Sequence, residues 1–352
     1  MADASFLMVT CQRGAETALK NDLTAAAGWR LAFSRPGFVT FKHDSPTADW
    51  PDSPFARTRS HSVGKAQSDQ LAELLDRFDG VLDGLADRHP GGFDHLHVWA
   101  RDRAVVGEFS FEPHAANPLV ADVAQRIYQH LTAGGRVAAS EPNQTASRGQ
   151  SVLDVVLVDP GQWWFGWHRA EDLPSSWPGA IPPVDAEQDV VSRAYFKLAE
   201  AVAWSQLPMR PGEHVFEIGS APGGACQRLL ELGFRVTGID PAEMDPRVLE
   251  HRHMTHVQAH AEDLKRSVYR DARWLVVDAT IKPQKTLWAV EGIVTSSEVS
   301  VRGMLLTLKL GSYERAEEIE QWTQRVRSWG YPRIAVRQLA TGRREICLAA
   351  SK

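Results

Sequence analysis

The second half of the chain alternates between two kinds of hydrophobic pattern. Short, continuously apolar segments occur at residues 214–218, 235–239, 274–277 and 304–308, and stretches with helical spacing separate them. Strands that are apolar at every position are typical of a parallel sheet covered by helices on both faces, because neither face meets water. From residue 189 onward the pattern therefore predicts an α/β domain built on a parallel sheet.

The first half predicts smaller α/β modules. Residues 6–10 and 37–42 alternate like strands around a helix at 14–27, which makes a compact unit over residues 1–58. A second module is expected over residues 59–172. Its predicted elements are a leucine-rich helix within 67–86, a strand at 95–100, a helix at 118–133 and a strand at 151–158.

A proline-rich segment separates the two halves. Prolines between residues 174 and 183 interrupt the periodicity on both sides, which is typical of a linker. We expect this linker to occupy residues 173–188 and to precede the α/β domain at 189–352.

Composition narrows the class of protein. The 352 residues are 43% hydrophobic and 24% charged, as in folded globular proteins of two or three domains. No apolar run approaches the roughly 20 residues that cross a bilayer, and the start lacks the basic residues of an export signal. We therefore expect a cytoplasmic protein with no membrane partner. The three cysteines share no metal-ligand spacing, and His95 and His97 lack a third ligand, so we predict no metal site.

The net charge of −5 restricts any contact with nucleic acid to local patches. Arginines at 101–103, 325–327 and 343–344 are candidates, although each pair is also typical of an ordinary solvated surface. The aromatic run at 163–168 has two interpretations as well. It suits stacking on unpaired bases, and it equally suits packing inside a domain.

A glycine-rich turn follows the first apolar strand of the second half and precedes a helix. In Gly219-Ser-Ala-Pro-Gly-Gly224, the residues Gly219, Ala221, Pro222, Gly223 and Gly224 are candidates for close backbone approach to a ligand. A dinucleotide fingerprint needs glycine at the third position, where this chain has Ala221, so a nicotinamide cofactor is disfavoured. A structural turn without a ligand is the alternative.

Two carboxylates follow the next predicted strands. Asp240 ends the second strand, where a carboxylate can accept both hydroxyls of a ribose, and Asp263 follows the third, where adenine edges are commonly bound. Together they favour an adenosine-containing ligand, whereas each alone also suits a helix N-cap.

Five segments carry a more specific pattern: Ser192-Arg-Ala-Tyr-Phe-Lys-Leu198, Gly219-Ser-Ala-Pro-Gly-Gly224, Val277-Asp278, Leu308-Lys309-Leu310 and Arg344-Glu345. In this order and spacing they resemble the FtsJ-type ribose 2′-O-methyltransferases. Within that family, Asp278-Ala-Thr-Ile-Lys-Pro283 and Cys11-Gln-Arg-Gly14 most resemble the members that act on large-subunit ribosomal RNA. The chain departs from the family at Ala225, where many relatives have an aromatic residue, and at Gly311, where those members have proline.

The resemblance implies a Rossmann-like methyltransferase domain behind a ferredoxin-like unit and a THUMP-like RNA-binding domain. It also implies S-adenosyl-L-methionine as the cofactor, bound by the glycine turn together with Asp240, Asp263 and Asp278. The implied partner is RNA, in particular the 23S ribosomal RNA or its precursor.

The same resemblance assigns catalysis to Lys197, Asp278, Lys309 and Glu345. A ribose 2′-hydroxyl is a poor nucleophile, so its methylation needs a base that takes the proton while the oxygen is held in line. Lys309 is the candidate base, because burial and a neighbouring ammonium on Lys197 favour a neutral amine. Asp278 would orient Lys309, and Glu345 would hold Lys197 or the ribose. Taken singly, these residues also suit a surface lysine, a helix cap and a charged hairpin.

Two other functions remain open at this point. One is a methyltransferase of the same fold that acts on a base nitrogen, a protein or a small molecule. The other is a non-catalytic RNA-binding assembly factor that retains the fold. The sequence does not choose the modified nucleotide or the oligomeric state.

Overall fold

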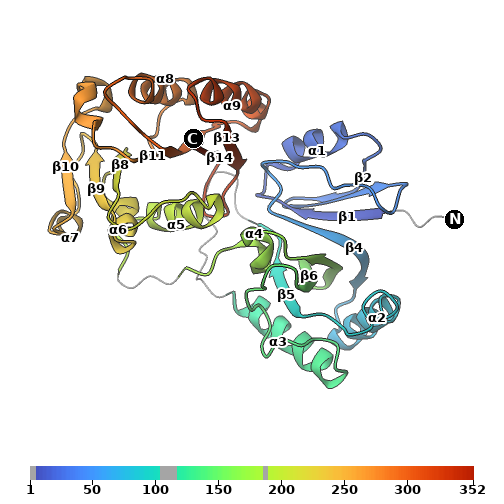
Figure 1. Ribbon diagram of the computed structural model, residues 1–352. Helices are drawn as coiled ribbons and strands as arrows, with labels where there is room; N and C mark the ends of the chain where they lie inside the picture. The colour runs from blue at the N-terminus through green and yellow to red at the C-terminus, as the bar shows by residue number, and fades with distance from the viewer. Residues whose placement is uncertain (1–4, 104–116, 185–188) are drawn as a thin grey trace. The chain divides into compact units, whose positions relative to one another are not determined.

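A computed structural model describes residues 5–103, 117–184 and 189–352 (Figure 1). The chain divides into two compact units, Met1–Pro183 and Val184–Lys352. Among the described residues, each unit is built around one seven-stranded sheet with helices packed on it. The predicted α/β class is therefore confirmed. Within the described residues, no helix is long and apolar enough to span a membrane.

The sheet of the second unit has the strand order β10-β9-β8-β11-β12-β14-β13. Its strands are β8 (His214–Ile218), β9 (Arg235–Ile239), β10 (Met254–Val257), β11 (Trp274–Val277), β12 (Gly303–Lys309), β13 (Arg333–Arg337) and β14 (Glu345–Ser351). Neighbours from β10 to β12 are parallel, whereas β14 pairs antiparallel with both β12 and β13. The sheet thus differs from the parallel sheet expected, because the loop 338–344 is too short for the crossover that a parallel pair needs.

Helices cover both faces of this sheet. Figure 1 shows α5 and α6 on one face and α8 and α9 on the other. The helices of the unit are α5 (Ala194–Ser205), α6 (Gly224–Glu231), α7 (Pro246–Leu249), α8 (Pro283–Val294) and α9 (Ile319–Ser328), with short 3-10 turns η2 (Ala261–Asp263), η3 (Arg266–Tyr269) and η4 (Tyr313–Glu318). The inner strands β8, β11 and β12 are buried almost throughout, as their largely apolar sequences predicted.

One continuous sheet also runs through the first unit, in the order β2-β3-β1-β4-β7-β6-β5. Its elements are β1 (Ser5–Thr10), α1 (Glu16–Ala25), β2 (Arg30–Arg35), β3 (Phe38–His43), β4 (Thr58–Gln67), α2 (Leu71–Asp83), β5 (His95–Ala100), α3 (Pro118–Ala133), β6 (Ser151–Asp159) and β7 (Gln162–Arg169). Strand β4 joins the two modules expected here, since it pairs with β1 on one side and β7 on the other. The division near residue 58 and the ferredoxin-like and THUMP-like assignments stay predictions.

The aromatic run of β7 contributes to the interior of the first unit. Trp163, Trp164 and Phe165 are 1%, 8% and 0% exposed. Phe165 packs near Phe78 of α2, with ring centroids 4.5 Å apart. These rings therefore follow the packing interpretation and do not form a solvent-facing platform for bases.

The beginning of the segment predicted as a linker is folded onto the first unit. It forms a short helix, α4 (Leu173–Ser176), and a 3-10 turn, η1 (Pro178–Ala180). His168 binds the carbonyl oxygen of Ser175 through Nε2 at 2.7 Å, and a side chain on Gly179 would lie 3.1 Å from the ring of Trp99. Residues 185–188, the end of the predicted linker, lie outside the described residues.

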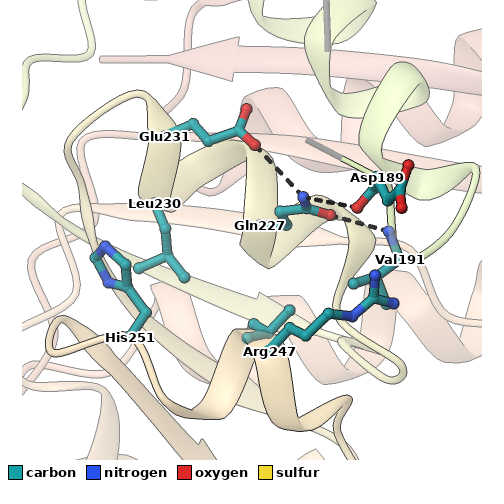
Figure 2. Close-up of a pocket in the computed structure, with 8 residues that line it drawn as sticks. Asp189, Val191, Gln227, Leu230, Glu231, Arg247 and His251 are labelled. Atoms are coloured by element: carbon teal, nitrogen blue, oxygen red, sulfur yellow. Dashed lines mark hydrogen bonds between the residues drawn. The ribbon is translucent and has the colours of Figure 1, made fainter. Parts of the chain in front are cut away.

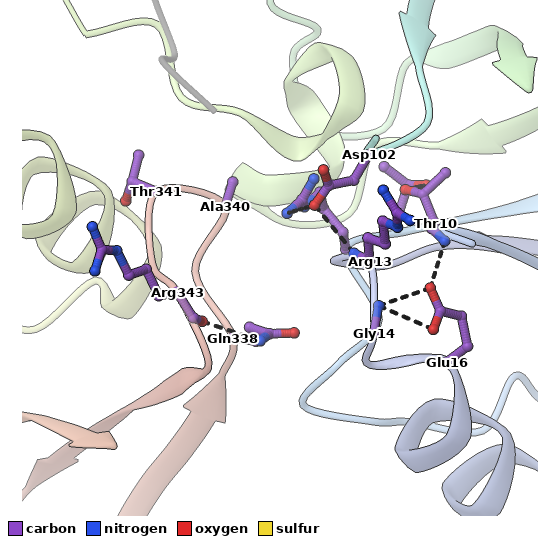
Figure 3. Close-up of polar contacts among 12 residues, drawn as sticks. Thr10, Arg13, Gly14, Glu16, Asp102, Gln338, Ala340, Thr341 and Arg343 are labelled. Atoms are coloured by element: carbon purple, nitrogen blue, oxygen red, sulfur yellow. Dashed lines mark hydrogen bonds and ion pairs between the residues drawn. The ribbon is translucent and has the colours of Figure 1, made fainter. Parts of the chain in front are cut away.

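The turn 11–14 is fixed within the first unit by a carboxylate (Figure 3). Both oxygens of Glu16 accept from the backbone N–H of Gly14 at 3.0 Å, and Oε1 also accepts from Gly37 N–H at 2.6 Å. The backbone N–H of Arg13 donates to Asp102 at 3.2 Å. Two acidic side chains thus stabilise this turn against neighbouring strands.

Candidate active site

The carboxyl ends of the parallel strands meet at one edge of the second unit's sheet. Gly219 follows β8, Asp240 follows β9 and Asp278 follows β11. The strand order reverses beside β8, because β9 lies on one side of it and β11 on the other. Open α/β sheets bind their ligands at such a switch point.

The turn between β8 and α6 needs glycine at two positions. Gly219 has φ +83° and Gly223 has φ +117°, a region that side chains rarely tolerate. A side chain on Gly219 would approach the carbonyl oxygen of Asp278 to 2.8 Å, and one on Gly223 would approach Sδ of Met244 to 2.6 Å. The turn therefore lies directly against the end of β11 on one side and the start of the α7 region on the other.

Asp240 ties this turn to the end of β9. Its Oδ2 accepts from the N–H of Ala221 at 3.2 Å, and its Oδ1 accepts from the N–H of Ala242 at 2.8 Å. A carboxylate has about four acceptor positions, so two further donors can still bind it. The neighbouring Pro222 accepts from the N–H of Asp245 through its carbonyl oxygen at 2.9 Å. Asp263 ends the η2 turn beyond β10 and is exposed.

Four charged side chains meet at the same edge of the sheet. Lys309 Nζ donates to Asp278 Oδ1 at 2.6 Å and to Glu345 Oε2 at 2.5 Å. Lys197 Nζ donates to Asp278 Oδ2 at 2.6 Å and forms an ion pair with Glu345 Oε1 at 2.8 Å. Each lysine therefore contacts both carboxylates, and each carboxylate contacts both lysines. We call these four residues the tetrad.

Three different parts of the fold bring the tetrad together. Lys197 lies on α5, Asp278 follows β11, and Lys309 and Glu345 are directly opposite each other in the antiparallel pair of β12 and β14. Of the four residues, Glu345 has the weakest support from the sequence, because its segment also suits a charged hairpin. The register of β14 places it in the site.

The tetrad is nearly closed to solvent, and this controls its charges. The side chains of Lys197 and Asp278 are 12% and 13% exposed. Burial alone lowers the pKa of Lys197, but Asp278 and Glu345 outweigh burial and hold that pKa above its usual range. Burial alone raises the pKa of Asp278, but Lys197 and Lys309 outweigh it and lower that pKa. Lys197 therefore remains an ammonium between two carboxylates.

A buried carboxylate next to the tetrad holds the loop that leads to Glu345. Glu200, one turn after Lys197 on α5, is 1% exposed. It accepts from Ala340 N–H at 2.8 Å, Thr341 N–H at 2.9 Å and Thr341 Oγ1 at 2.7 Å. In the same loop, the Gln338 amide donates to the carbonyl oxygen of Arg343 at 3.3 Å (Figure 3). One helix thus carries a tetrad lysine and fixes the loop between β13 and β14.

Two buried acids of this region are not apparent from the sequence motifs. The position of Glu200, three residues after Lys197, was the available signal, because helix positions i and i+3 share a face. Glu217 on β8 is the second, and its Oε2 accepts from the thiol of Cys226 at 2.8 Å. Burial raises the pKa of Glu217 to about 8.

A pocket of about 390 Å³ lies beside α6, and none of the tetrad lines it (Figure 2). Gln227 lines it, and there Oε1 accepts from Val191 N–H at 3.0 Å and Nε2 donates to the carbonyl oxygen of Asp189 at 3.4 Å. The segment before α5 is thereby attached to α6. Nearby, a side chain on Gly224 would overlap Oγ of Ser192, so the start of α5 packs directly on the glycine turn.

Metal ligation is not apparent in the part of the chain that the structure describes. No group of three or more His, Cys, Asp or Glu side chains is arranged there to hold an ion. His95 and His97 instead bind the side-chain oxygen of Gln150 at 2.9 Å and the carbonyl oxygen of Gln144 at 2.8 Å.

Comparison with known proteins relates part of the second unit to a known family. Residues 190–297 match the family model of the FtsJ-like methyltransferases. This part of the chain is therefore similar to the FtsJ-like methyltransferases. The matched range contains the glycine turn and two tetrad residues, Lys197 and Asp278, whereas Lys309 and Glu345 follow it.

Two relatives of the chain carry the same name. The ribosomal RNA large subunit methyltransferase M of Halorhodospira halophila is 27% identical over 97% of this chain and 95% of its own length. The protein of the same name from Methylococcus capsulatus is 29% identical over 55% of this chain and 56% of its own. The first alignment extends through both units, and the second spans just over half of the relative. The resemblance found in the sequence motifs is thus confirmed.

Proposed function

We propose that this FtsJ-like chain is an S-adenosyl-L-methionine-dependent RNA methyltransferase that modifies a ribose 2′-hydroxyl. The observation that carries the proposal is the tetrad itself, a partly buried set of two lysines and two carboxylates beside a glycine turn. Large-subunit ribosomal RNA is the proposed substrate, because the relatives are named for it and one of them aligns over nearly the whole chain. A cytoplasmic location follows from that substrate.

The residues at the switch point fit the cofactor. The glycine turn presents its backbone at the start of α6, and the carboxylate of Asp240 retains acceptor positions suited to ribose hydroxyls. Asp263 is proposed to bind the adenine edge, and Asp278 to lie near the sulfonium. S-adenosyl-L-methionine would supply the methyl group.

The tetrad residues are proposed to prepare the hydroxyl. Lys309 in its neutral form accepts the proton of the 2′-hydroxyl on Nζ. Lys197 stays charged, because the carboxylates of Asp278 and Glu345 raise its pKa. Asp278 and Glu345 hold the Lys309 amine in place through contacts of 2.6 and 2.5 Å. Such positioning and proton transfer typically accelerate a reaction about 10²- to 10⁴-fold.

Radiolabelled cofactor tests this function directly. The full chain is incubated with methyl-labelled S-adenosyl-L-methionine and undermodified 23S ribosomal RNA, and the RNA is then hydrolysed in alkali. Alkali cannot cut beside a 2′-O-methyl ribose, so we expect label in a resistant dinucleotide. Label in mononucleotides would indicate base methylation instead, and absence of transfer alongside cofactor binding would favour another acceptor.

Lys309→Ala is the accompanying variant. We expect it to lose at least about 100-fold in rate while keeping cofactor affinity, because a general base contributes at least that much. Lys352→Ala is the matched control, since Lys352 follows the end of β14 at the opposite edge of the sheet. Full activity of Lys309→Ala would contradict the proposed base.

A further inference from the structure

An aromatic side chain is exposed on the helix that follows Asp278. Trp288 of α8 is 60% exposed, more than any other large hydrophobic residue in the described ranges. The opposite face of α8 packs inward through residues such as Leu287 and Val290, which are 1% and 0% exposed. Packing against the sheet therefore accounts for the apolar residues of α8 but not for Trp288, since an exposed indole gains no free energy from burial.

Two cations lie along the same face of α8. Lys285 precedes Trp288 by three positions and Gly292 follows it by four, so the three positions are neighbours on the helix surface. A side chain on Gly292 would lie 2.7 Å from Nη2 of Arg266. The glycine thus allows the guanidinium of Arg266, from the η3 turn, to rest against α8 one turn beyond Trp288.

These cations are available to an external anion. Neither Lys285 nor Arg266 forms an ion pair with any carboxylate among the residues described, and Lys285 is exposed. Glu291 on the same helix is already paired with Arg325 at 2.5 Å. In a chain with a net charge of −5, such a concentration of positive charge around an exposed indole is local and specific.

Lys285 and Trp288 follow the tetrad residue Asp278 closely in the sequence. Lys282, also exposed, lies four residues after Asp278 and immediately before α8. With a rise of about 1.5 Å per residue, Trp288 lies only about 7.5 Å along the helix from its first residue. We name Lys282, Lys285, Trp288 and Arg266 the α8 strip.

We propose that the α8 strip binds single-stranded RNA beside the nucleotide whose ribose enters the tetrad. Trp288 stacks on an unpaired base, and the lysines and Arg266 contact neighbouring phosphates. Proteins bind single-stranded nucleic acid with alternating aromatic and cationic side chains. The aromatic rings stack on the bases, and the cations contact the negatively charged phosphates. This inference rests on the proposed function and assigns part of the substrate contact to the methyltransferase unit itself.

Fluorescence anisotropy with the full chain measures the contact. The probe is a fluorescein-labelled, mixed-sequence single-stranded RNA. We expect Trp288→Ala to raise the Kd about 5- to 150-fold, which is the range for loss of one stacked base. Trp288→Phe should keep most of the affinity, because the ring remains. Leu249→Ala on α7 is the matched control, since Leu249 is also exposed, at 43%.

The salt dependence of the Kd tests the proposed contacts between the cations of the α8 strip and phosphates. Lys285→Glu should raise the Kd and make the slope of log Kd against log salt concentration shallower by about 0.7 for each phosphate that the variant no longer binds. Arg333→Glu is the charge control, since Arg333 begins β13 at the sheet edge opposite the tetrad. Unchanged slopes for Lys285→Glu would overturn the phosphate contact.

The outcomes separate this inference from the proposed function. If Trp288→Ala and Lys285→Glu bind the probe like their controls, the α8 strip is not an RNA surface, even when the unaltered chain methylates RNA. If these variants lose binding while the unaltered chain transfers no methyl group to RNA, the α8 strip is an RNA-binding surface but the proposed reaction is wrong. A change from oligomer to monomer in Trp288→Ala, without a change in RNA affinity, would overturn the inference and assign the strip to a second copy of the chain.

Discussion

Replacing Glu200 with glutamine should open the loop 338–344 without unfolding the domain. The Glu200 carboxylate is 1% exposed and accepts from two backbone N–H groups and one hydroxyl. A glutamine of the same shape keeps one accepting oxygen for Ala340 N–H. Its NH₂ group then faces the N–H of Thr341, although the Thr341 hydroxyl can rotate to accept. One buried N–H is therefore left without an acceptor.

The expected cost follows from that single missing acceptor. Leaving one buried donor unsatisfied costs about 1–3 kcal/mol, and relief of a buried charge offsets part of it. Because about 1.4 kcal/mol is a factor of ten, amide exchange at residues 340 and 341 should accelerate about 5- to 150-fold. Methyl transfer should fall with it, because the loop leads directly into Glu345, while cofactor affinity should stay unchanged.

Hydrogen exchange measured by mass spectrometry on peptides covering the loop checks this reasoning. Glu250→Gln is a suitable control, since Glu250 is exposed and belongs to the same unit. If the loop of Glu200→Gln exchanges as slowly as that of the unaltered chain, the three hydrogen bonds do not hold the loop. The account of Glu200 as a positioning residue would then be wrong.

Two further substitutions test the region around the glycine turn. Glu217→Gln should change how stability depends on pH: burial raises the folded-state pKa of Glu217 to about 8 from an ordinary 4.5, so between these values the unfolded state binds fewer protons. The stabilising contribution of this group is full below about pH 4.5 and is lost as the pH rises through about 8, and urea titrations across that range should show a shallower decline in the variant; equal slopes would refute it. Gly224→Ala should lower the free energy of unfolding by about 1–3 kcal/mol, because its Cβ would overlap Ser192 Oγ and lie 2.7 Å from the Ser192 carbonyl oxygen. Adding Ser192→Ala should restore only part of the loss, since the carbonyl contact remains; complete restoration would show that the backbone contact does not matter.

The local pattern of hydrophobic and polar residues was sufficient to predict most helices and strands. The helix expected at 118–133 is α3, with Asn117 capping it through hydrogen bonds from the N–H groups of Leu119 and Val120. The strand expected at 95–100 is β5. Both depend on period and capping, which neighbouring residues determine.

Other features could not be predicted from the sequence, because they depend on contacts between residues that are distant in the chain. The first half reads as two modules, yet β4 pairs on both sides to make one sheet. The aromatic run of β7 had two interpretations, and burial decided between them. The α8 strip was not recognised, because an exposed tryptophan and an apolar core residue look alike in a helical repeat.

The sequence by itself determined the α/β class, the glycine turn and the resemblance of the second unit to the FtsJ-like methyltransferases, since these depend on short segments whose composition and order are sufficient. Only the tertiary structure decided how the tetrad is assembled. Lys197 and Asp278 are 81 positions apart, and Lys309 and Glu345 are 36 apart. Their contacts depend on the packing of α5 against the glycine turn and on the register of β14 beside β12. Register and packing are set by the whole core, because a slip of one residue in β14 would turn Glu345 to the other face of the sheet.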